Sequence, residues 1–146
     1  MPTSTKVKAT LFHHLPPLEK GIIYELGGGW GAIALALAKQ YPQLQVVAFE
    51  ISPIPFWVAR CRALLCGVKN LQFRRKDFFK EELVDAALIY CYLFPGAMRK
   101  LEHELPPGSL LCSNAFAWQG KEPAKVVLIE DLHASKLYIY GDLPLT

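Results

Sequence analysis

Short apolar runs alternate with longer segments whose apolar positions have helical spacing along most of this chain. The pattern predicts strands over 22–26, 45–49, 71–75, 86–92 and 109–113. It predicts helices over 31–41, from about 53 to Gly67, and over 95–105. Strands that alternate with helices form parallel sheets, because each crossover helix returns the chain to the same edge. An α/β fold is therefore expected.

The two ends of the chain depart from this rhythm. A short helix to about His14 is predicted before a pair of prolines, and we expect residues 1–20 to be a lid or packing segment before a domain over 21–146. Residues 125–130 and 136–140 have strand character, and the segment between them is too short for a crossover helix. The predicted fold is a three-layer αβα sandwich, with a doubly wound, mostly parallel seven-stranded sheet that ends in an antiparallel hairpin.

Composition narrows the class of protein. The 146 residues, 52% of them hydrophobic, are enough for one domain, and no apolar run approaches the length of a membrane span. We expect a soluble, cytoplasmic protein. The net charge is +3, and the one tight basic cluster, Arg74-Arg75-Lys76, is interpreted as a solvated strand end, so nucleic-acid binding is not favoured.

No cysteine lies in a CxxC pair or at zinc spacing from a histidine, so no metal site is expected. Trp57 is interpreted as a packing residue in the middle of its helix. Reduced core thiols are predicted for all four cysteines, Cys61, Cys66, Cys91 and Cys112.

The most informative stretch is the point where the strand over 22–26 runs into Gly27, Gly28, Gly29 and Gly31. Residues without a Cβ let the backbone turn sharply and approach a ligand closely. The helix that follows points free N–H groups toward the same place. This stretch therefore predicts a loop that binds a nucleotide-type cofactor.

Acidic residues stand where the first three strands end, and in a parallel sheet those ends meet at one crevice. Glu25 lies at the end of the first strand and can accept hydrogen bonds from a ligand ammonium. Glu50 follows the second strand and can accept from both hydroxyls of a ribose. Asp77 and Phe78 follow the third strand and offer an acceptor and an aromatic face to adenine. These residues predict an adenosine-containing ligand with a charged tail.

The glycine string does not by itself decide which ligand binds. Gly27-x-Gly29-x-x-Ala32, with Glu50 as the ribose acceptor, also fits the fingerprint of an NAD-binding oxidoreductase. That function needs a hydride-handling substrate domain, for which this chain has no room. Three features favour a class of protein other than the oxidoreductases. They are the carboxylate of Glu25 inside the strand end, the bulk of Trp30 at the helix start, and the terminal hairpin.

These three features resemble the class I S-adenosylmethionine-dependent methyltransferases, whose fold is Rossmann-like. In that family the string Glu25-Leu26-Gly27-Gly28-Gly29-Trp30-Gly31 corresponds to the segment that carries the methionine part of the cofactor. The resemblance implies S-adenosyl-L-methionine as the cofactor. It implies cofactor contacts at Glu25, Gly27, Gly28, Gly29, Gly31, Glu50, Ile51, Asp77, Phe78 and Tyr92.

A narrower resemblance rests on two segments, 88–95 and 105–116. They are similar to the small lysine methyltransferases of the ATP synthase c subunit and the adenine nucleotide translocase, and to their prokaryotic relatives. This chain differs from them in lacking a membrane-targeting segment at its N-terminus. The resemblance implies methyl transfer to an amine of a protein, or to a small-molecule acceptor. Acceptor contacts are predicted at Tyr92, Phe94, Pro95 and Trp118. A non-catalytic S-adenosylmethionine-binding module is the alternative, because the N-terminal element is small.

Overall fold

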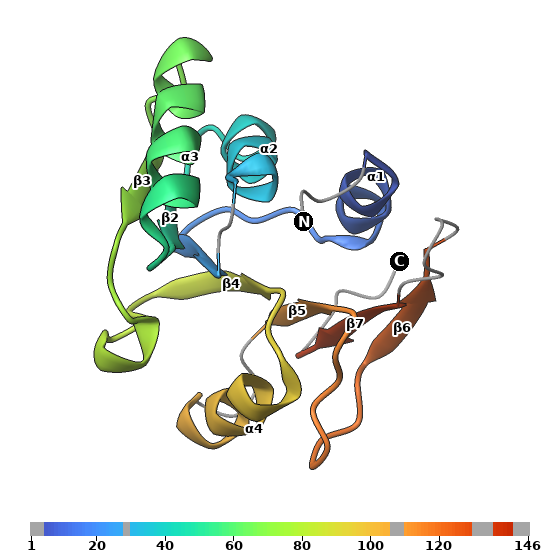
Figure 1. Cartoon of the computed structure of the whole chain (residues 1–146). Coiled ribbons are helices and arrows are strands. Elements are labelled where there is room, and N and C mark those ends of the chain that lie inside the picture. Colours follow the sequence, from blue (N-terminus) through green and yellow to red (C-terminus); the bar gives the residue numbers. More distant parts are fainter. Residues whose placement is uncertain (1–4, 28–29, 106–109, 130–135, 142–146) are drawn as a thin grey trace.

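The computed structural model describes residues 5–27, 30–105, 110–129 and 136–141, and its centre is a seven-stranded sheet (Figure 1). The strands lie in the order β3-β2-β1-β4-β5-β7-β6. All pairs among β1 to β5 are parallel, and β7 is antiparallel to both β5 and β6. The expected mixed sheet with its terminal hairpin is confirmed. The strands are β1 (Ile22–Leu26), β2 (Gln45–Phe49), β3 (Leu71–Arg74), β4 (Ala86–Cys91), β5 (Leu111–Asn114), β6 (Lys125–Leu128) and β7 (Lys136–Tyr140).

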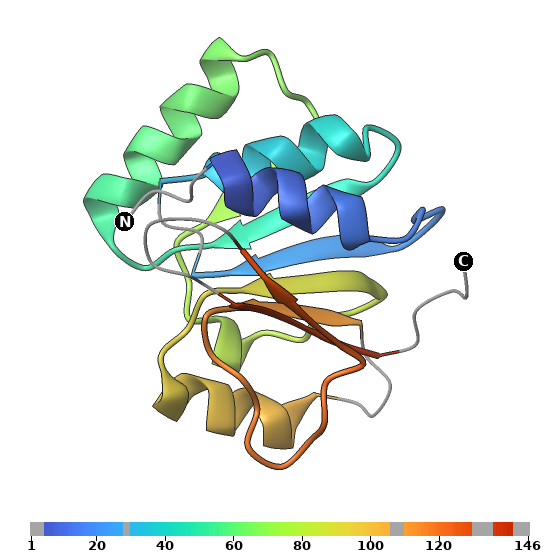
Figure 2. The same ribbon diagram turned by 90° about the vertical axis from the view of Figure 1, so that its right-hand side faces the viewer.

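Helices cover both faces of the sheet, which gives the three expected layers (Figures 1 and 2). One face carries α1 (Thr5–His14), α2 (Ala32–Gln40) and α3 (Pro53–Leu65). The other carries α4 (Pro95–Glu104) and a short 3-10 helix, η1 (Phe78–Lys80). In the described part of the chain, no helix has the length and apolar character to cross a bilayer.

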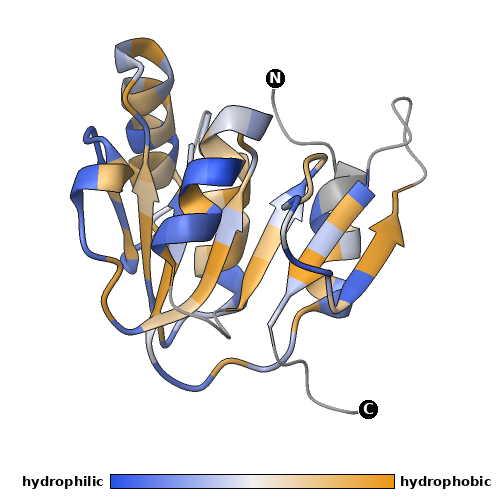
Figure 3. Ribbon diagram, turned by 90° about the horizontal axis from the view of Figure 1, so that it is seen from below, coloured by the Kyte–Doolittle hydropathy of each residue, from blue (hydrophilic) through white to orange (hydrophobic). Residues whose placement is uncertain are grey.

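The core consists of two clusters, one on each face of the sheet, because successive strand residues point to opposite faces. In β1, Ile23 belongs to the cluster under α2, whereas Tyr24 and Leu26 belong to the cluster over α4. Figure 3 looks onto α4, whose outer surface is hydrophilic, with hydrophobic strands behind it. Leu11 of α1 is fully buried in the first cluster. The division into residues 1–20 and 21–146 stays a prediction, but this part of α1 packs as core.

Two sequence-based expectations about α3 are wrong. Trp57 is not a packing residue, since 54% of its surface is exposed, and the thiols of Cys61 and Cys66 are exposed too. The helix packs on the sheet through Phe56 and small alanines. Trp57 and Cys61 lie on the side of the helix that faces away from the sheet. The remaining two cysteines are buried as expected, and burial raises the pKa of Cys91 to about 12.

Candidate active site

The loop after β1 passes very close to the segment that follows β4. Gly27 has φ 75°, a conformation that side-chain-bearing residues rarely adopt. A Cβ on Gly27 would lie 3.3 Å from Leu93 Cδ2 and 3.7 Å from the Tyr92 carbonyl oxygen. The absence of a side chain therefore lets the segments that follow β1 and β4 approach closely, at the sheet edge where the sequence predicts the cofactor crevice.

Gly31 needs to be glycine for a reason that the sequence did not reveal. It is the N-cap of α2 with φ 87°, and a Cβ there would lie only 2.7 Å from Ala59 Cβ of α3. Close packing of α2 on α3 accounts for this glycine, and its predicted cofactor contact stays a prediction. Gly28 and Gly29 lie outside the described residues.

Glu25 is a buried acid without a full set of partners. Only 3% of its surface is exposed, and its Oε2 atom has no hydrogen-bond partner. Burial raises the pKa of this carboxyl well above its usual value, and the charge of Glu50 raises it further, whereas a hydrogen bond from the Ala34 backbone lowers it. An unpartnered acceptor at the end of β1 suits a cationic ligand group.

This raised pKa makes the stability of the cofactor-free protein depend on pH. The folded protein keeps the Glu25 proton at pH values where the unfolded chain has lost it, so the free energy of unfolding should fall as pH rises above about 4.5. Glu25→Gln removes that titration. We expect the variant to unfold at a higher temperature than wild type at pH 7, and the difference to shrink toward pH 4.

Thermal unfolding of the cofactor-free proteins between pH 4 and pH 8 measures this difference, with the exposed Glu19 changed to Gln as the control. The control should follow wild type at every pH. Parallel curves for wild type and Glu25→Gln would contradict the raised pKa.

The end of β2 is ordered by short-range hydrogen bonds. Oε1 of Glu50 accepts from the Ser52 N–H at 3.0 Å. The next residue, Ile51, exposes 58% of its surface, while its carbonyl accepts from Arg75 Nε at 3.0 Å. An oriented carboxylate followed by an exposed apolar side chain can bind a ribose and cover an adenine.

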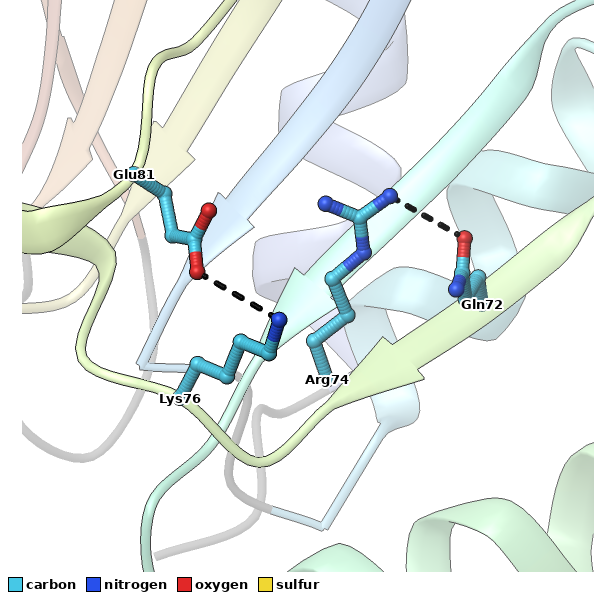
Figure 4. A network of polar contacts seen from close by, with 4 residues as sticks. All are labelled: Gln72, Arg74, Lys76 and Glu81. Carbon is cyan, nitrogen blue, oxygen red and sulfur yellow. Dashed lines mark hydrogen bonds and ion pairs between the residues drawn. The ribbon is translucent and has the colours of Figure 1, made fainter.

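The basic cluster after β3 is engaged locally, as the sequence interpretation holds. Arg74 donates to Gln72 Oε1 at 3.3 Å, and Lys76 pairs with Glu81 at 3.6 Å (Figure 4). Each of the three cations therefore has a partner close by: Gln72 for Arg74, the Ile51 carbonyl for Arg75 and Glu81 for Lys76.

Asp77 caps η1, an element that the sequence analysis did not predict. Its Oδ1 accepts from the Phe79 N–H at 3.0 Å. Phe78 is half-buried and packs against the second core cluster. The cap fixes the carboxylate just beyond the end of β3, so one oxygen is committed to the protein backbone. Adenine contacts of Asp77 and Phe78 stay predictions.

Three aromatic side chains gather beyond β4 and β5, and we call them the aromatic rim: Tyr92, Phe94 and Phe116. The ring of Phe116 lies 6.3 Å from those of both Tyr92 and Phe94. Tyr92 and Phe94 are 48% and 79% exposed. Pro95, also predicted to contact the acceptor, is exposed at the first position of α4. The rim is an exposed apolar surface at the predicted crevice.

Phe116 was missed as a site residue because a tight turn brings it there. Ala115 has φ 76°, and its N–H donates to the Lys136 carbonyl at 2.8 Å. The Ser113 hydroxyl donates to the Phe116 carbonyl and closes the turn. A positive φ at a residue other than glycine is costly and is typical of functional sites. The sequence carries no glycine or asparagine at that position to indicate it.

A row of buried polar side chains crosses the sheet on β1, β4 and β5, and we call it the polar row: Glu25, Tyr90 and Asn114. Glu25 and Tyr90 are register partners, and Asn114 lies two residues beyond Cys112, the β5 partner of Tyr90. The Tyr90 hydroxyl and Asn114 Oδ1 are buried and make no hydrogen bond of full geometry, but the Asn114 side chain interacts with Tyr90 and lowers the pKa that burial raises. Burial raises the pKa of Tyr90 well above its usual value, so its hydroxyl stays protonated. Unsatisfied buried polar atoms are rare, and three in one row indicate a ligand site.

Trp118, predicted to contact the acceptor, is buried in the second core cluster. Only 5% of it is exposed, and its ring centre lies 4.6 Å from that of Tyr140. Its backbone N–H donates to the Tyr140 hydroxyl at 2.8 Å, Lys121 lies over its ring, and its indole Nε1 is buried without a hydrogen-bond partner. The hairpin strand β7 supplies the partner, a contact that local sequence cannot reveal. Packing on Tyr140 accounts for the burial of the Trp118 ring. Its predicted acceptor contact stays a prediction.

A cavity of about 320 Å³ lies elsewhere, between η1 and α4. Its walls include Phe78, Leu83 and Leu101, and glutamates stand at its rim. It shares only Phe78 with the predicted site, and we assign it no part in the reaction.

The fold, the glycine loop and the buried acid at the end of β1 define a class I S-adenosylmethionine-dependent methyltransferase. The chain matches the ANTKMT methyltransferase domain family over residues 25–125 and belongs to that family. The resemblance seen in the sequence is therefore confirmed, and the NAD-dependent and non-catalytic alternatives find no support.

Relatives with known activities are similar over much of the chain. A protein-lysine N-methyltransferase of Saccharolobus islandicus is 26% identical, and the match covers 97% of this chain and 93% of that protein. The adenine nucleotide translocase lysine N-methyltransferase of Mus musculus is 31% identical over 73% of this chain, which spans about half (48%) of the mouse protein.

Among solved structures, an RNA methyltransferase of Salinibacter ruber bound to S-adenosyl-L-homocysteine superposes with a TM-score of 0.83. It is 27% identical, and the match covers 99% of this chain and 97% of that one.

The cofactor of this enzyme is S-adenosylmethionine, and the site residues fit it. When bound, it supplies an electrophilic methyl group on a sulfonium. The orphan Oε2 of Glu25 can accept from a ligand ammonium. The individual cofactor contacts at Glu25, Glu50, Asp77 and their neighbours stay predictions.

Proposed function

We propose that this enzyme methylates the side-chain amine of lysine in a protein acceptor. The observation that carries the proposal is the aromatic rim, which follows β4 and β5, the strands that hold Tyr90 and Asn114 of the polar row. Two relatives that act on protein lysine, from Saccharolobus islandicus and mouse, support it. The coarser conclusion, an S-adenosylmethionine-dependent methyltransferase, does not depend on this choice of acceptor.

The aromatic rim suits the shape and charge of a lysine side chain. Its long apolar stem can pack on exposed rings such as Phe94, and an ammonium is attracted to the faces of aromatic rings. Tyr92 and Phe116 stack nearly in parallel, with 26° between their planes, so they form one wall. Partial removal of water between such rings lowers the pKa of lysine from about 10.4 and favours the neutral amine that reacts.

The polar row offers hydrogen-bond acceptors that would orient the neutral amine. Asn114 Oδ1, which makes no hydrogen bond of full geometry, would accept from an amine N–H, and the oxygen of the Tyr90 hydroxyl that interacts with it would be a second acceptor. With its hydrogens held, the amine keeps its lone pair free to form the new N–C bond. The bound cofactor would supply the methyl group, and its sulfur would take the electron pair of the S–C bond, so the leaving group would need no proton. The proton lost earlier from lysine goes to water, and catalysis rests on alignment.

Three carboxylates are proposed to hold the cofactor. Glu25 would accept from its ammonium, and Glu50 from its ribose hydroxyls. Asp77 would accept from the adenine amine with the oxygen that the η1 cap does not use. The order of these residues follows the order of β1, β2 and β3 along the sheet edge.

Label transfer with amino-acid analysis tests the proposed acceptor. Purified enzyme and S-adenosylmethionine with a labelled methyl group are added to an extract of cells that lack the enzyme. One portion is treated with ribonuclease beforehand and one with protease. We expect the protein fraction to be labelled, and its acid hydrolysate to contain methylated lysine. Protease treatment should remove the labelled product, while ribonuclease treatment should leave it.

The possible outcomes separate the acceptor from the enzyme class. Methylated nucleosides that disappear with ribonuclease would overturn lysine in favour of RNA. Label on arginine or glutamine would overturn lysine but keep a protein acceptor. Glu50→Ala serves as the control for label that does not come from this enzyme.

A further inference from the structure

Helix α3 has two apolar faces. Phe56, Ala59 and Ala63 are buried against the sheet. Successive residues of a helix are rotated by about 100°, so a second set of side chains points about 180° away from the buried three. That second set consists of large apolar or thiol side chains, all exposed, and we call it the outer stripe: Ile54, Trp57, Val58, Cys61, Leu64 and Leu65.

The exposure of the outer stripe is unusually high. Leu64 and Leu65 expose 75% and 88% of their surfaces, and Ile54 exposes 69%. Scattered apolar residues are normal on a protein surface, but a continuous stripe of large ones indicates an interaction site. Figure 1 shows α3 as the outermost helix of its layer, beyond α2 and α1, so the stripe lies at an edge of the molecule.

Cations lie on both sides of the outer stripe. By the same helical rotation, Arg60 and Arg62 lie at its two borders. Arg60 lies 5.5 Å from the Trp57 ring, and Arg62 reaches the Trp30 carbonyl at 3.0 Å while remaining exposed. The helix contains no acidic residue. A tryptophan-containing apolar face bordered by arginines is the composition of a helix that lies in a membrane interface.

We propose that the outer stripe of α3 binds the surface of an anionic lipid bilayer. Charge decides between this occupant and a second copy of the chain. In a two-fold dimer through α3, the arginines of one copy would face those of the other, with no carboxylate on either helix to pair with them. Anionic headgroups complement the arginines instead, and the apolar side chains enter the headgroup boundary. The 13-residue helix lies on the bilayer and does not cross it.

Vesicle sedimentation tests this proposal. Wild-type protein is mixed with vesicles of phosphatidylcholine alone, or of phosphatidylcholine with phosphatidylglycerol. We expect binding to the anionic vesicles, weaker binding when salt is raised, and little binding to the neutral ones. Leu64→Ser with Leu65→Ser should reduce binding about tenfold or more, because both side chains leave the apolar surface.

A matched pair and a fluorescence signal sharpen the test. Val126→Ser with Leu128→Ser removes exposed apolar side chains from the edge strand β6, and this pair should bind vesicles as wild type does. Anionic vesicles should shift tryptophan emission to shorter wavelength, and Trp57→Phe should remove most of the shift, since Trp118 is already buried and Trp30, 37% exposed, lies outside the outer stripe.

Three results would overturn the proposal. One is equal vesicle binding by wild type and the Leu64 and Leu65 variant, and another is no binding to anionic vesicles by folded wild type. The third is a dimer in solution that this variant converts to a monomer, which would assign the outer stripe to a second copy of the chain. Unfolding temperatures establish that each variant is folded.

Discussion

Glu50→Ala is expected to weaken S-adenosylmethionine binding about 100-fold, because two hydrogen bonds to a charged acceptor are lost, each worth about 1.5 kcal/mol. The Glu50 carboxylate is already oriented in the cofactor-free protein. Its Oε1 is held by the Ser52 N–H at 3.0 Å, and it follows β2 directly. Little ordering of the side chain therefore remains to oppose binding of the ribose hydroxyls.

Calorimetric titration with S-adenosylmethionine and S-adenosylhomocysteine measures the loss. Both ligands share the ribose, so both should weaken by the same factor. Glu19→Ala removes an exposed carboxylate outside the predicted site and should leave both affinities unchanged. If Glu50→Ala binds both ligands with wild-type affinity, Glu50 does not contact the ribose.

Short sequence patterns were sufficient to predict the strands of the sheet and which strand ends share one edge. The cofactor contacts proposed at that edge stay predictions. β2 has a β-branched pair before its terminal acid, and prolines mark the starts of α3 and α4. Strand ends converge by topology alone once the sheet is parallel, so Glu25 and Glu50 could be placed together without coordinates. That the charge of Glu50 raises the pKa of Glu25 is the measurable sign of their proximity.

Contacts between distant segments could not be read from the sequence. Phe116 reaches the site through a turn after Asn114, the last residue of β5, and the positive φ of this turn falls on Ala115. Trp118 packs on β7, a strand that follows it by about 20 residues. Trp57 shows a different limit. Helical spacing identifies apolar faces but not which face is buried, and α3 has two of them.

Asn114→Ala is expected to lower kcat about 100-fold while leaving cofactor affinity within about twofold of wild type. The substitution removes the acceptor proposed to orient the amine, so the lone pair is aligned with the methyl group in fewer encounters. The three carboxylates proposed to hold the cofactor, Glu25, Glu50 and Asp77, lie at the ends of β1, β2 and β3, away from β5, so cofactor affinity should be unaffected. Single-turnover methylation of a lysine acceptor measures the rate, and calorimetry measures the affinity.

The same experiment distinguishes alignment from loss of structure. Gln119→Ala removes an exposed amide from the loop that follows β5 and should keep wild-type kcat. Asn114→Asp keeps acceptor oxygens at the same place, so it should recover part of the rate that Asn114→Ala loses, whereas a purely structural role predicts that a buried acid does at least as much harm. Equal losses of rate and of cofactor affinity in Asn114→Ala would show that Asn114 supports the fold of the crevice and does not orient the amine.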